Sequence, residues 1–440
     1  MKPRRWSSAA LIATTIAAAV SGCGGGGNAT TGTGTSPIPT VDWPYFGRVP
    51  ERTHYVPSAP DPPFKFDWVF WAKQLIEFPP AIVGDSMFVV NKAGTTFDVR
   101  TSDGKVRWQR NLGNTVTGPA YAHGLVYAAQ FDGEFAALDS KTGKVRWTFH
   151  TPTHLESSPL AVGGNVYFGS DGGTLFALDA STGKLAWKQD LGAPVKASPT
   201  YHDGVVYVGD YAGRIHALSA AGGKPRWSVD TGGGGFYSSP AIDFGKLYEA
   251  SSNGTLFALT LAGHVAWRFK TSNDIYSSPA VADIPGSGPT VFIGSYNHQL
   301  YALNAKTGSK RWQFDVGGQV PGSPTVIGKT VYTSSFQTSK TTGLDARTGK
   351  PRWQWGSAGY DPVVSDGRRN FVIGFQTIWA FEDCSPPTAG SQGQTAAGGD
   401  GSVPVCQRAA DLHLLDVRHA MKRETPKASA ARALKRRAAG

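Results

Sequence analysis

Residues 198–227 of the chain read SPTYHDGVVYVGDYAGRIHALSAAGGKPRW. The stretch divides into four short segments with alternating apolar positions, separated by turns at His202-Asp203-Gly204, Tyr211-Ala212-Gly213 and Ala221-Gly222-Gly223. Short alternating segments joined by glycine-bearing turns are typical of consecutive antiparallel hairpins. The stretch therefore predicts one sheet of four antiparallel strands.

The same phrase recurs along the chain, each time with a tryptophan near its end. The intervals between these tryptophans are 40, 39, 40, 40, 40, 45 and 41 residues. A four-stranded sheet of this length cannot bury both faces alone, so the sheets must stack, and radial stacking gives a β-propeller. We expect these side chains to be structural residues at the contacts between blades: Trp68, Trp108, Trp147, Trp187, Trp227, Trp267, Trp312 and Trp353.

The strand pair that opens each repeat occurs eight times. The eighth repeat, residues 361–383, ends before its tryptophan-bearing strand, whereas residues 64–71 form such a strand without a repeat of their own. We therefore predict an all-β, eight-bladed β-propeller of four-stranded antiparallel blades over residues 42–383. The N-terminal strand completes the last blade and removes its open edge. The repeats begin near Pro80, Pro119, Pro159, Pro199, Pro240, Pro279, Pro324 and Pro362.

Composition agrees with this fold, and charge argues against nucleic-acid binding. The chain has 55 Gly, 29 Pro and 13 Trp, and only 17% of its residues are charged, which suits short strands joined by tight turns. The net charge of +11 is concentrated at the ends: three basic residues precede Trp6, and residues 407–440 hold nine Lys or Arg against three Asp or Glu. The body carries only +2, so we expect no nucleic-acid partner.

The N-terminus has the pattern of an export signal. Basic residues precede an apolar run that is too short to span a bilayer, and the run ends in Val20-Ser21-Gly22-Cys23. This ending resembles the bacterial lipoprotein box, so we predict a signal peptide at 1–22 and lipidation of Cys23, with ordinary cleavage as the alternative. Residues 23–41 are predicted to be a flexible tether. The protein is therefore expected outside the cytoplasm, anchored to a membrane of the bacterial cell envelope.

Residues 384–440 are predicted to be a partly disordered, basic C-terminal extension. Its cysteines, Cys384 and Cys406, are expected to form a disulfide in an oxidising compartment, with two free thiols as the alternative. Residues 409–423 are expected to form a short helix with Leu412, Leu415 and Met421 near one face. The basic end is either solvated or bound to anionic lipid head groups or wall polymer.

The phrase from Ala137 to Trp147 matches the pattern A-x-D-x-x-T-G-x-x-x-W, and residues 177–187 match it as well. This pattern resembles the tryptophan-docking motif of the pyrroloquinoline-quinone (PQQ)-type propeller repeat, and the resemblance covers roughly residues 64–383. One branch of that family, the quinoprotein dehydrogenases, holds PQQ and calcium at the propeller centre. Its cofactor is covered by a disulfide between adjacent cysteines, which this chain does not contain. A second branch is the non-catalytic propeller lipoprotein of the outer-membrane β-barrel assembly machine, which is more similar to this chain.

The resemblance implies a non-enzymatic scaffold that binds a protein of the cell envelope, and we expect a monomer. The alternatives are a PQQ- and calcium-dependent dehydrogenase and a binder of envelope polysaccharide. The chain contains no placeable motif for catalysis or metal binding, so no catalytic residue, metal or cofactor is predicted.

The second turn of each repeat supplies a candidate binding face. Equivalent turn positions form a ring on one face of a propeller, and half of this ring is aromatic. Aromatic side chains at turn tips either meet a ligand or pack on neighbouring inter-blade loops such as 233–237. The ring consists of Lys92, Phe131, Asp171, Tyr211, Ser252, Tyr296, Phe336 and Gln376, and the candidate binding residues are Phe131, Tyr211, Tyr296 and Phe336.

Overall fold

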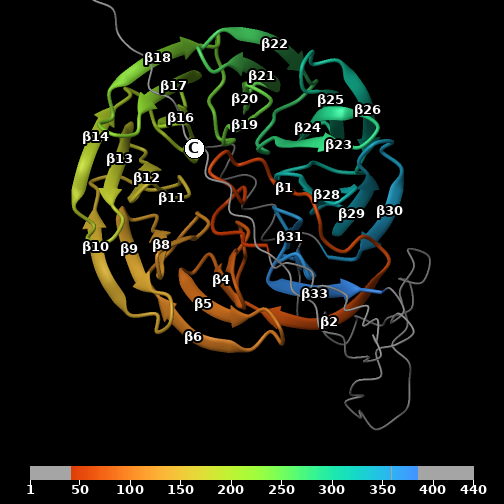
Figure 1. Cartoon of the computed structure of the whole chain (residues 1–440), viewed down its shortest axis with the longest axis horizontal. Helices are drawn as coiled ribbons and strands as arrows, with labels where there is room; N and C mark the ends of the chain where they lie inside the picture. The colour runs from red at the N-terminus through yellow and green to blue at the C-terminus, as the bar shows by residue number, and fades with distance from the viewer. Residues whose placement is uncertain (1–40, 358, 385–440) are drawn as a thin grey trace, which may run out of the picture. The chain divides into compact units, whose positions relative to one another are not determined.

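The computed structural model describes residues 41–357 and 359–384, and the regular structure in these residues is entirely β-strand. The strands form eight separate sheets, which lie as blades around a central axis (Figure 1). The predicted eight-bladed propeller is therefore confirmed. Seven of the eight blades have four strands. The remaining one, blade 7, has a fifth, short strand.

The strands of the first four blades, from the axis outward, have the following bounds. Blade 1 contains β3 Ala81–Val83, β4 Ser86–Val90, β5 Thr95–Arg100 and β6 Val106–Asn111. Blade 2 contains β7 Ala120–Ala122, β8 Leu125–Ala129, β9 Glu134–Asp139 and β10 Val145–His150. Blade 3 contains β11 Leu160–Val162, β12 Asn165–Gly169, β13 Thr174–Asp179 and β14 Leu185–Asp190. Blade 4 contains β15 Thr200–His202, β16 Val205–Gly209, β17 Arg214–Ser219 and β18 Pro225–Asp230.

The remaining blades repeat the pattern. Blade 5 contains β19 Ala241–Asp243, β20 Lys246–Ser251, β21 Thr255–Thr260 and β22 Val265–Lys270. Blade 6 contains β23 Ala280–Ile284, β24 Gly288–Gly294, β25 Gln299–Asn304 and β26 Lys310–Asp315. Blade 7 contains β1 Tyr55–Val56, β27 Thr325–Ile327, β28 Thr330–Ser335, β29 Lys340–Asp345 and β30 Pro351–Trp355. Blade 8 contains β31 Val363–Ser365, β32 Arg369–Ile373, β33 Thr377–Asp383 and β2 Phe64–Trp71.

Burial along a blade follows from its position between two others. All five residues of β16 are buried, because both faces of this strand pack against neighbouring blades. The outermost strand β18 alternates between exposed and half-buried residues instead. The second and third strands of each blade therefore form the core, while the fourth strand lies at the surface.

The last blade is closed by a strand from the other end of the propeller, as predicted. Strand β2 pairs antiparallel with β33, with Phe64 opposite Asp383 and Trp71 opposite Thr377. The backbone groups of β33 on this side are thereby paired rather than exposed. This closure joins residues that are more than 300 positions apart in the sequence.

Seven of the blade junctions use the same indole contact. In each, the Nε1 of the repeat tryptophan donates a hydrogen bond to a backbone carbonyl in the last turn of the next blade. The ring lies against a glycine with positive φ: a Cβ at Gly143 would lie 2.5 Å from the Trp108 ring. The indoles are those of Trp68, Trp108, Trp147, Trp187, Trp227, Trp267 and Trp312.

The junction between blades 7 and 8 is built differently, because blade 8 has no turn between its third and fourth strands. Blade 8 takes its third and fourth strands from distant parts of the chain, so no turn connects β33 to β2. Here Trp353 packs edge-on against Phe64, with ring centroids 5.5 Å apart, and against Phe381 at 5.6 Å. An aromatic cluster thus takes the place of the glycine turn.

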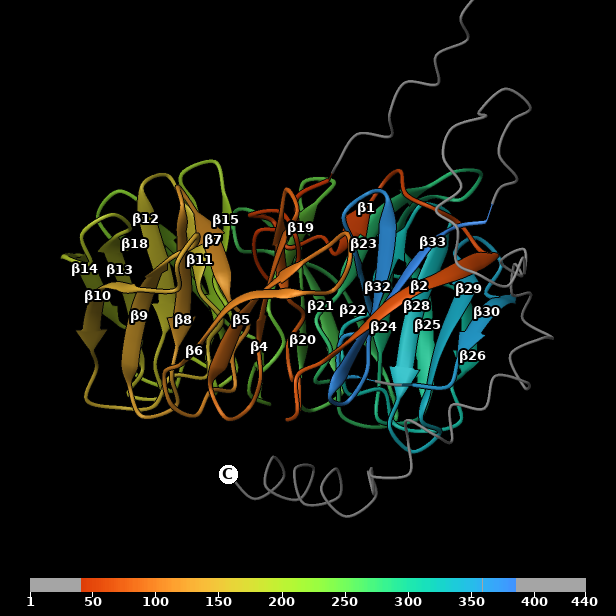
Figure 2. The same ribbon diagram turned by 90° about the horizontal axis from the view of Figure 1, so that it is seen from below.

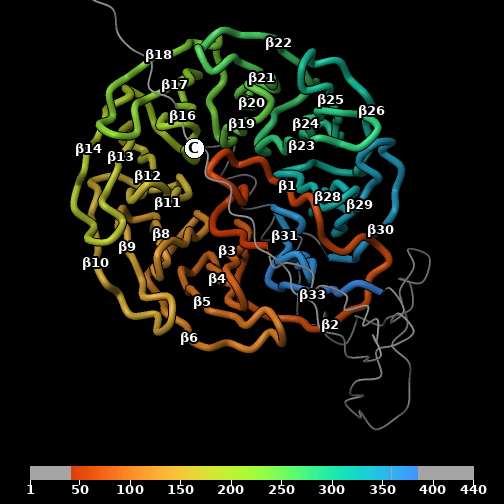
Figure 3. The backbone as a smooth tube through the Cα atoms, viewed as in Figure 1, coloured from red at the N-terminus to blue at the C-terminus, as the bar shows by residue number. Residues whose placement is uncertain are grey.

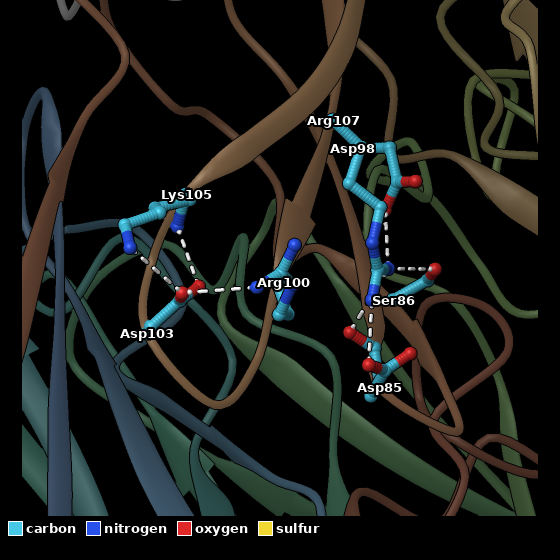
Figure 4. A network of polar contacts seen from close by, with 7 residues as sticks. All are labelled: Asp85, Ser86, Asp98, Arg100, Asp103, Lys105 and Arg107. Atoms are coloured by element: carbon cyan, nitrogen blue, oxygen red, sulfur yellow. Dashed lines mark hydrogen bonds and ion pairs between the residues drawn. The ribbon is translucent and has the colours of Figure 1, made fainter.

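Arg107, which directly precedes the repeat tryptophan Trp108, has partners inside its own blade. In blade 1, Arg107 contacts Asp85, Ser86 and the buried Asp98, whose carboxylate lies 3.5 Å from its Nη1 (Figure 4). Burial nevertheless raises the pKa of Asp98. The neighbouring turn holds a second group, in which Asp103 contacts Arg100 and Lys105. The arginine therefore compensates a buried carboxylate as well as placing charge on an outer strand.

Residues 41–56 form the feature that the repeat pattern did not reveal. This segment, which we call the hub segment, runs through the middle of the ring (Figure 3). Its strand β1 pairs parallel with β27, and Trp43 forms a bridge with Ile82. Backbone hydrogen bonds also join it to the innermost strands of blades 2, 4, 5 and 6, and to Asp366 in the turn after β31 of blade 8.

The hub segment lies toward one face of the ring (Figure 2). Asp42 accepts a hydrogen bond from Gly84 N, and the carbonyl of Val56 accepts one from Gly328 N. Both glycines lie in the turn between the first and second strands of a blade, so we call this side the turn face. The opposite side, the loop face, carries the second turn of each blade and the inter-blade loops.

Candidate binding site on the propeller axis

The loop face is hollowed at the propeller axis. A pocket with an empty volume of about 390 Å³, part of it open to solvent, is lined by residues from the inter-blade loops and from the hub segment. Its aromatic lining residues are Phe46, Phe78, Tyr237, Tyr276 and Tyr360, and its charged ones are Glu77, Lys196 and Asp361. Axial pockets that combine an aromatic lining with a few polar groups are a common setting for ligand or partner binding.

A belt of serine residues forms the pocket wall. Each serine directly precedes the proline that begins a blade, and its hydroxyl oxygen accepts a hydrogen bond from the equivalent backbone N–H of the preceding blade. The six bonds of the belt are 2.9–3.0 Å long, and the last ends on Asp361. The belt consists of Gly118, Ser158, Ser198, Ser239, Ser278, Ser323 and Asp361.

The belt is interrupted at blade 1. The equivalent position there is Pro79, which has no N–H to donate and no hydroxyl to accept, and Gly118 of blade 2 has no side chain. Elsewhere the repeated bond fixes the distance between adjacent blades at the axis. The pocket wall is therefore a rigid arc.

The hub segment supplies the pocket floor. Phe46 is buried, with the His54 ring edge-on at 4.8 Å and the Arg52 guanidinium 5.5 Å from the ring centroid. Arg52 is fully buried and donates hydrogen bonds to the carbonyls of Pro199, Phe46, Ser158 and Pro159. Burial lowers the pKa of Arg52 to about 9, so the group remains charged at neutral pH. Burial and the nearby guanidinium lower the pKa of His54 to about 3, which keeps this ring neutral.

Tyrosines form one side of the pocket rim. The Tyr276 ring lies between Tyr237, at 6.2 Å, and Tyr296, at 4.9 Å. Burial, followed by the charge of Asp274, raises the pKa of Tyr276 to about 12. The hydroxyl thus remains protonated at physiological pH, and the rim presents apolar ring faces with neutral polar tips. Such side chains contribute large contact areas at low entropic cost.

A charged cluster stands on another part of the rim. Lys196 Nζ lies 3.0 Å from Glu156 Oε1, 3.9 Å from Asp171 Oδ2, and 5.1 Å from the centre of the Tyr211 ring. Burial, followed by the charge of Glu156, raises the pKa of Asp171 to about 6. The cluster therefore gains positive charge as the pH falls through 6.

The structure places all four candidate binding residues on the loop face, and each contacts a neighbour. Phe131 stacks on His154 at 4.3 Å, Tyr211 packs beside Gly235, and Tyr296 contacts Tyr276. Phe336 contacts Tyr360 at 4.6 Å and Phe375 at 5.8 Å. Three of them thus border residues of the axial pocket or its rim, whereas Phe131 contacts the loop between blades 2 and 3. Their role in binding remains a prediction.

Other predicted residues lie partly outside the described part of the chain. Cys384 is disulfide-bonded, but its predicted partner Cys406 and the predicted lipidation site Cys23 lie outside the described residues. Within residues 41–357 and 359–384 there is no helix of the length and apolarity needed to cross a bilayer.

The serine belt and the hub segment were both missed from the sequence. The belt has a visible signal, because Ser-Pro opens five consecutive repeats from Ser158 to Ser323. The hub segment has a weaker one: Trp43, Tyr45 and Phe46 form an aromatic cluster in a stretch that has no repeat partner.

Known structures share this architecture. BamB from Moraxella catarrhalis is similar, with a TM-score of 0.62 and 20% sequence identity over 72% of this chain and 99% of that chain. The quinohemoprotein alcohol dehydrogenase from Comamonas testosteroni is similar with a TM-score of 0.65 and 15% identity, over 78% of this chain and 80% of that chain. At these identities the likeness shows the fold alone.

The dehydrogenase likeness raises the question of whether the axial pocket fits PQQ with calcium. Calcium is normally held by several oxygen ligands, including carboxylates. The part of the chain that the structure describes contains no group of three or more His, Cys, Asp or Glu side chains able to hold a metal ion. Of the two pocket carboxylates, Asp361 already accepts a hydrogen bond from the Ser323 N–H. The oxygen donors that line the axial pocket therefore do not fit PQQ with calcium.

Comparison with known sequences gives one match to a short part of the chain and one that extends over most of the propeller. The serine/threonine-protein kinase AfsK of Streptomyces griseus is 32% identical over 90 residues, which are 20% of this chain and only 11% of the kinase. A family model matches residues 67–194, 152–268 and 262–383, well over half of the chain. The chain therefore belongs to the family described as outer membrane protein assembly factor BamB.

Proposed function

We propose that this chain is a non-enzymatic scaffold of the bacterial cell envelope, tethered to a membrane through Cys23, whose loop face docks a partner protein. The axial pocket with its tyrosine rim carries the proposal. It offers aromatic anchors beside polar groups on a hydrogen-bonded wall, which is the arrangement found at binding hot spots. Similarity to an assembly factor supports the same role.

The pocket dimensions favour a narrow ligand segment. Phe46 of the hub segment lines the pocket, and its buried ring packs against His54. An extended loop that inserts one or two side chains fits this shape better than a flat protein surface does. The Lys196 cluster on the rim holds one ammonium group against the carboxylates of Glu156 and Asp171, so it adds a place for a basic side chain of the partner.

Photo-crosslinking from single positions tests this proposal in the protein's own envelope. A photoreactive phenylalanine analogue at Tyr276, on the pocket rim, is expected to yield a discrete partner adduct. The same analogue at Lys105, whose side chain is 76% exposed on the turn face, is the control and is expected to yield none. Equal adducts at both positions would contradict docking through the loop face. Saturable PQQ binding with calcium-dependent alcohol oxidation would instead support the enzyme alternative.

Removal of the tyrosine rim gives a quantitative prediction. Replacing Tyr237 and Tyr276 together with alanine is expected to weaken partner binding at least about tenfold, because buried aromatic anchors dominate interface energies. Both side chains are only half-buried in the free protein, so the melting temperature is expected to fall by only a few degrees. The affinity is measured by titration with the partner that the crosslinking identifies, and the melting temperature is measured by calorimetry. Unchanged affinity would exclude this rim as the docking site.

A further inference from the structure

The two faces of the propeller carry opposite charge. The second turns and the inter-blade loops, which form the loop face, hold three Lys against seven Asp or Glu. The seven third turns, between the third and fourth strands of blades 1 to 7, lie at the outer edge of the turn face and hold eight Lys or Arg against one Asp. The first turns, nearer the axis, hold two Lys or Arg against three Asp. The positive charge of the turn face is therefore concentrated at its outer edge.

The repeat places these basic side chains at equivalent points around the circle. In five of the seven third turns, the residue directly after the turn glycine is lysine. Blade 8 has no third turn, so the circle is open there. All eight basic side chains are exposed, and we call them the basic ring: Lys105, Lys141, Lys144, Lys184, Lys224, Lys306, Arg347 and Lys350.

The turns themselves do not require the charged groups of the basic ring. In blade 2 the N–H of Asp139 donates a hydrogen bond to the carbonyl of Lys144 at 2.8 Å, a backbone contact that any residue can make. The Asp139 carboxylate accepts its turn hydrogen bond from the Thr142 hydroxyl, also at 2.8 Å. Of the eight ring members, only Lys105 forms an ion pair within the described part of the chain, with Asp103 at 3.4 Å. The other charges are therefore free to meet an external partner.

A circle of exposed cations on one face fits a broad, flat, anionic partner. A narrow ligand or a single polymer strand would contact a few neighbouring blades, whereas a membrane surface can meet the whole circle at once. Anionic lipid head groups attract Lys and Arg side chains that come within about a Debye length, roughly 8 Å at physiological ionic strength. The tips of the third turns hold the charges at the edge of the molecule, where this short range suffices.

The chain also enters the propeller on the turn face. The N–H of Val41 donates a hydrogen bond to the carbonyl of Asp366, in the first turn of blade 8, and Asp42 accepts one from Gly84 N, in the first turn of blade 1. Val41 follows Cys23 by 18 positions, which a fully extended chain spans in at most about 65 Å. A lipid on Cys23 is therefore attached to the same face as the basic ring.

We propose that the basic ring binds the anionic lipid head groups of the membrane that carries the anchor, so that the turn face lies on the membrane. This inference rests on the tether of the proposed function. The same membrane repels the negatively charged loop face, which consequently points away from it. The axial pocket is thereby left open to a partner protein.

Vesicle binding of the full chain tests the basic ring without the anchor. In the background Cys23→Ser, the triple variant Lys144→Glu, Lys184→Glu, Lys224→Glu is expected to bind vesicles of phosphatidylglycerol and phosphatidylcholine at least about tenfold more weakly, since each lysine near an anionic membrane strengthens binding roughly fivefold. The control variant has the same change in net charge at exposed lysines outside the ring and is expected to lose no more than about twofold: Lys73→Glu, Lys188→Glu, Lys340→Glu. The basic residues 427–437 are the same in both variants, so they do not contribute to the difference.

Lysine acetylation of the lipidated full chain tests the orientation without substitutions. On vesicles that contain phosphatidylglycerol, Lys184 and Lys224 are expected to react severalfold more slowly than on vesicles of phosphatidylcholine alone. Lys73 and Lys340, toward the loop face, are expected to keep their rates.

Three outcomes would overturn the proposal. They are equal vesicle affinities of the two triple variants, equal acetylation of Lys184 and Lys224 on both kinds of vesicle, and ring-dependent binding to soluble polyphosphate without binding to vesicles, which would favour a polymer as the ligand. The vesicle measurement requires neither the anchor nor a partner protein, so its failure is distinguishable from a failure of lipidation at Cys23 or of docking at Tyr276.

Discussion

Replacing Arg52 with alanine is expected to lower the free energy of unfolding by about 3–5 kcal/mol, because the substitution removes the charged donor of hydrogen bonds to buried backbone carbonyls. Arg52 Nε lies 2.7 Å from the carbonyl oxygen of Pro199 in blade 4, and Nη2 reaches Ser158 and Pro159 in blade 3. The guanidinium also lies over Phe46. Its removal leaves these acceptors unsatisfied and opens a void beneath the axial pocket. Chemical denaturation monitored by tryptophan fluorescence measures the change.

Arg48 is the matched control in the same segment. It is half-buried and donates one side-chain hydrogen bond, to the carbonyl of Tyr55 at 2.7 Å. Arg48→Ala is therefore expected to cost only about 1 kcal/mol, the net value of a single hydrogen bond. Arg52→Lys retains the charge but not the fork of donors, and is expected to fall between the two. Equal losses for Arg48→Ala and Arg52→Ala would show that the hub segment contributes no specific stability.

Replacing Glu249 with glutamine is expected to stabilise the propeller at neutral pH. Glu249 is fully buried on β20, at a position where blades 1, 3 and 4 have Val89, Phe168 and Val208. A Cβ at Gly209 would lie 2.3 Å from its Oε1, so the carboxyl group is packed tightly against the neighbouring blade. Burial, followed by the charge of Asp210, raises the pKa of Glu249 well above 4.5. The native state therefore binds this proton more tightly than the unfolded chain does.

The sign of the pH dependence follows from this difference. Above pH 4.5 the unfolded chain releases the proton while the native state retains it, so stability falls as the pH rises, by about 1.4 kcal/mol per pH unit up to the native pKa. Glu249→Gln removes this dependence, so the stability gained is expected to be almost nothing at pH 4.5 and to grow as the pH rises toward 7. Denaturation curves at several pH values measure the effect. Glu134→Gln, at the half-buried first position of β9, is the control. Identical pH profiles for the unmodified protein and the Glu249→Gln variant would refute the prediction.

The propeller was predictable because its determinants repeat. Most blades share the same alternation and the same glycine-bearing turns, so a pattern that is weak in one copy becomes clear when it recurs along the chain. The closing strand followed from the same count, since the strand with Trp68 had no repeat of its own and the repeat at residues 361–383 had no fourth strand with a repeat tryptophan. Docking at the last junction was not predictable in detail, because Trp353 replaces the missing turn with contacts to Phe64 and Phe381 that have no counterpart elsewhere.

The axial site was predictable only in part. Tyr211, Tyr296 and Phe336 were singled out by their turn positions, and the structure places them beside the pocket or its rim. The pocket floor was missed because residues 41–56 bind mainly through backbone groups, which leave no periodic pattern in the sequence. Arg52 was missed for a related reason: a buried arginine that binds carbonyl oxygens has no acidic partner that would identify it.

The hub segment and β2 also set the order in which the protein can be completed. Both lie at the start of the chain, yet they bind the inner strands of the later blades and β33. During synthesis the hub segment can meet blades 1 and 2 early, whereas its contacts with the later blades and the pairing of β2 wait until those sheets have been synthesised. A nascent chain that stops before β33 leaves β2 without the strand that it pairs with.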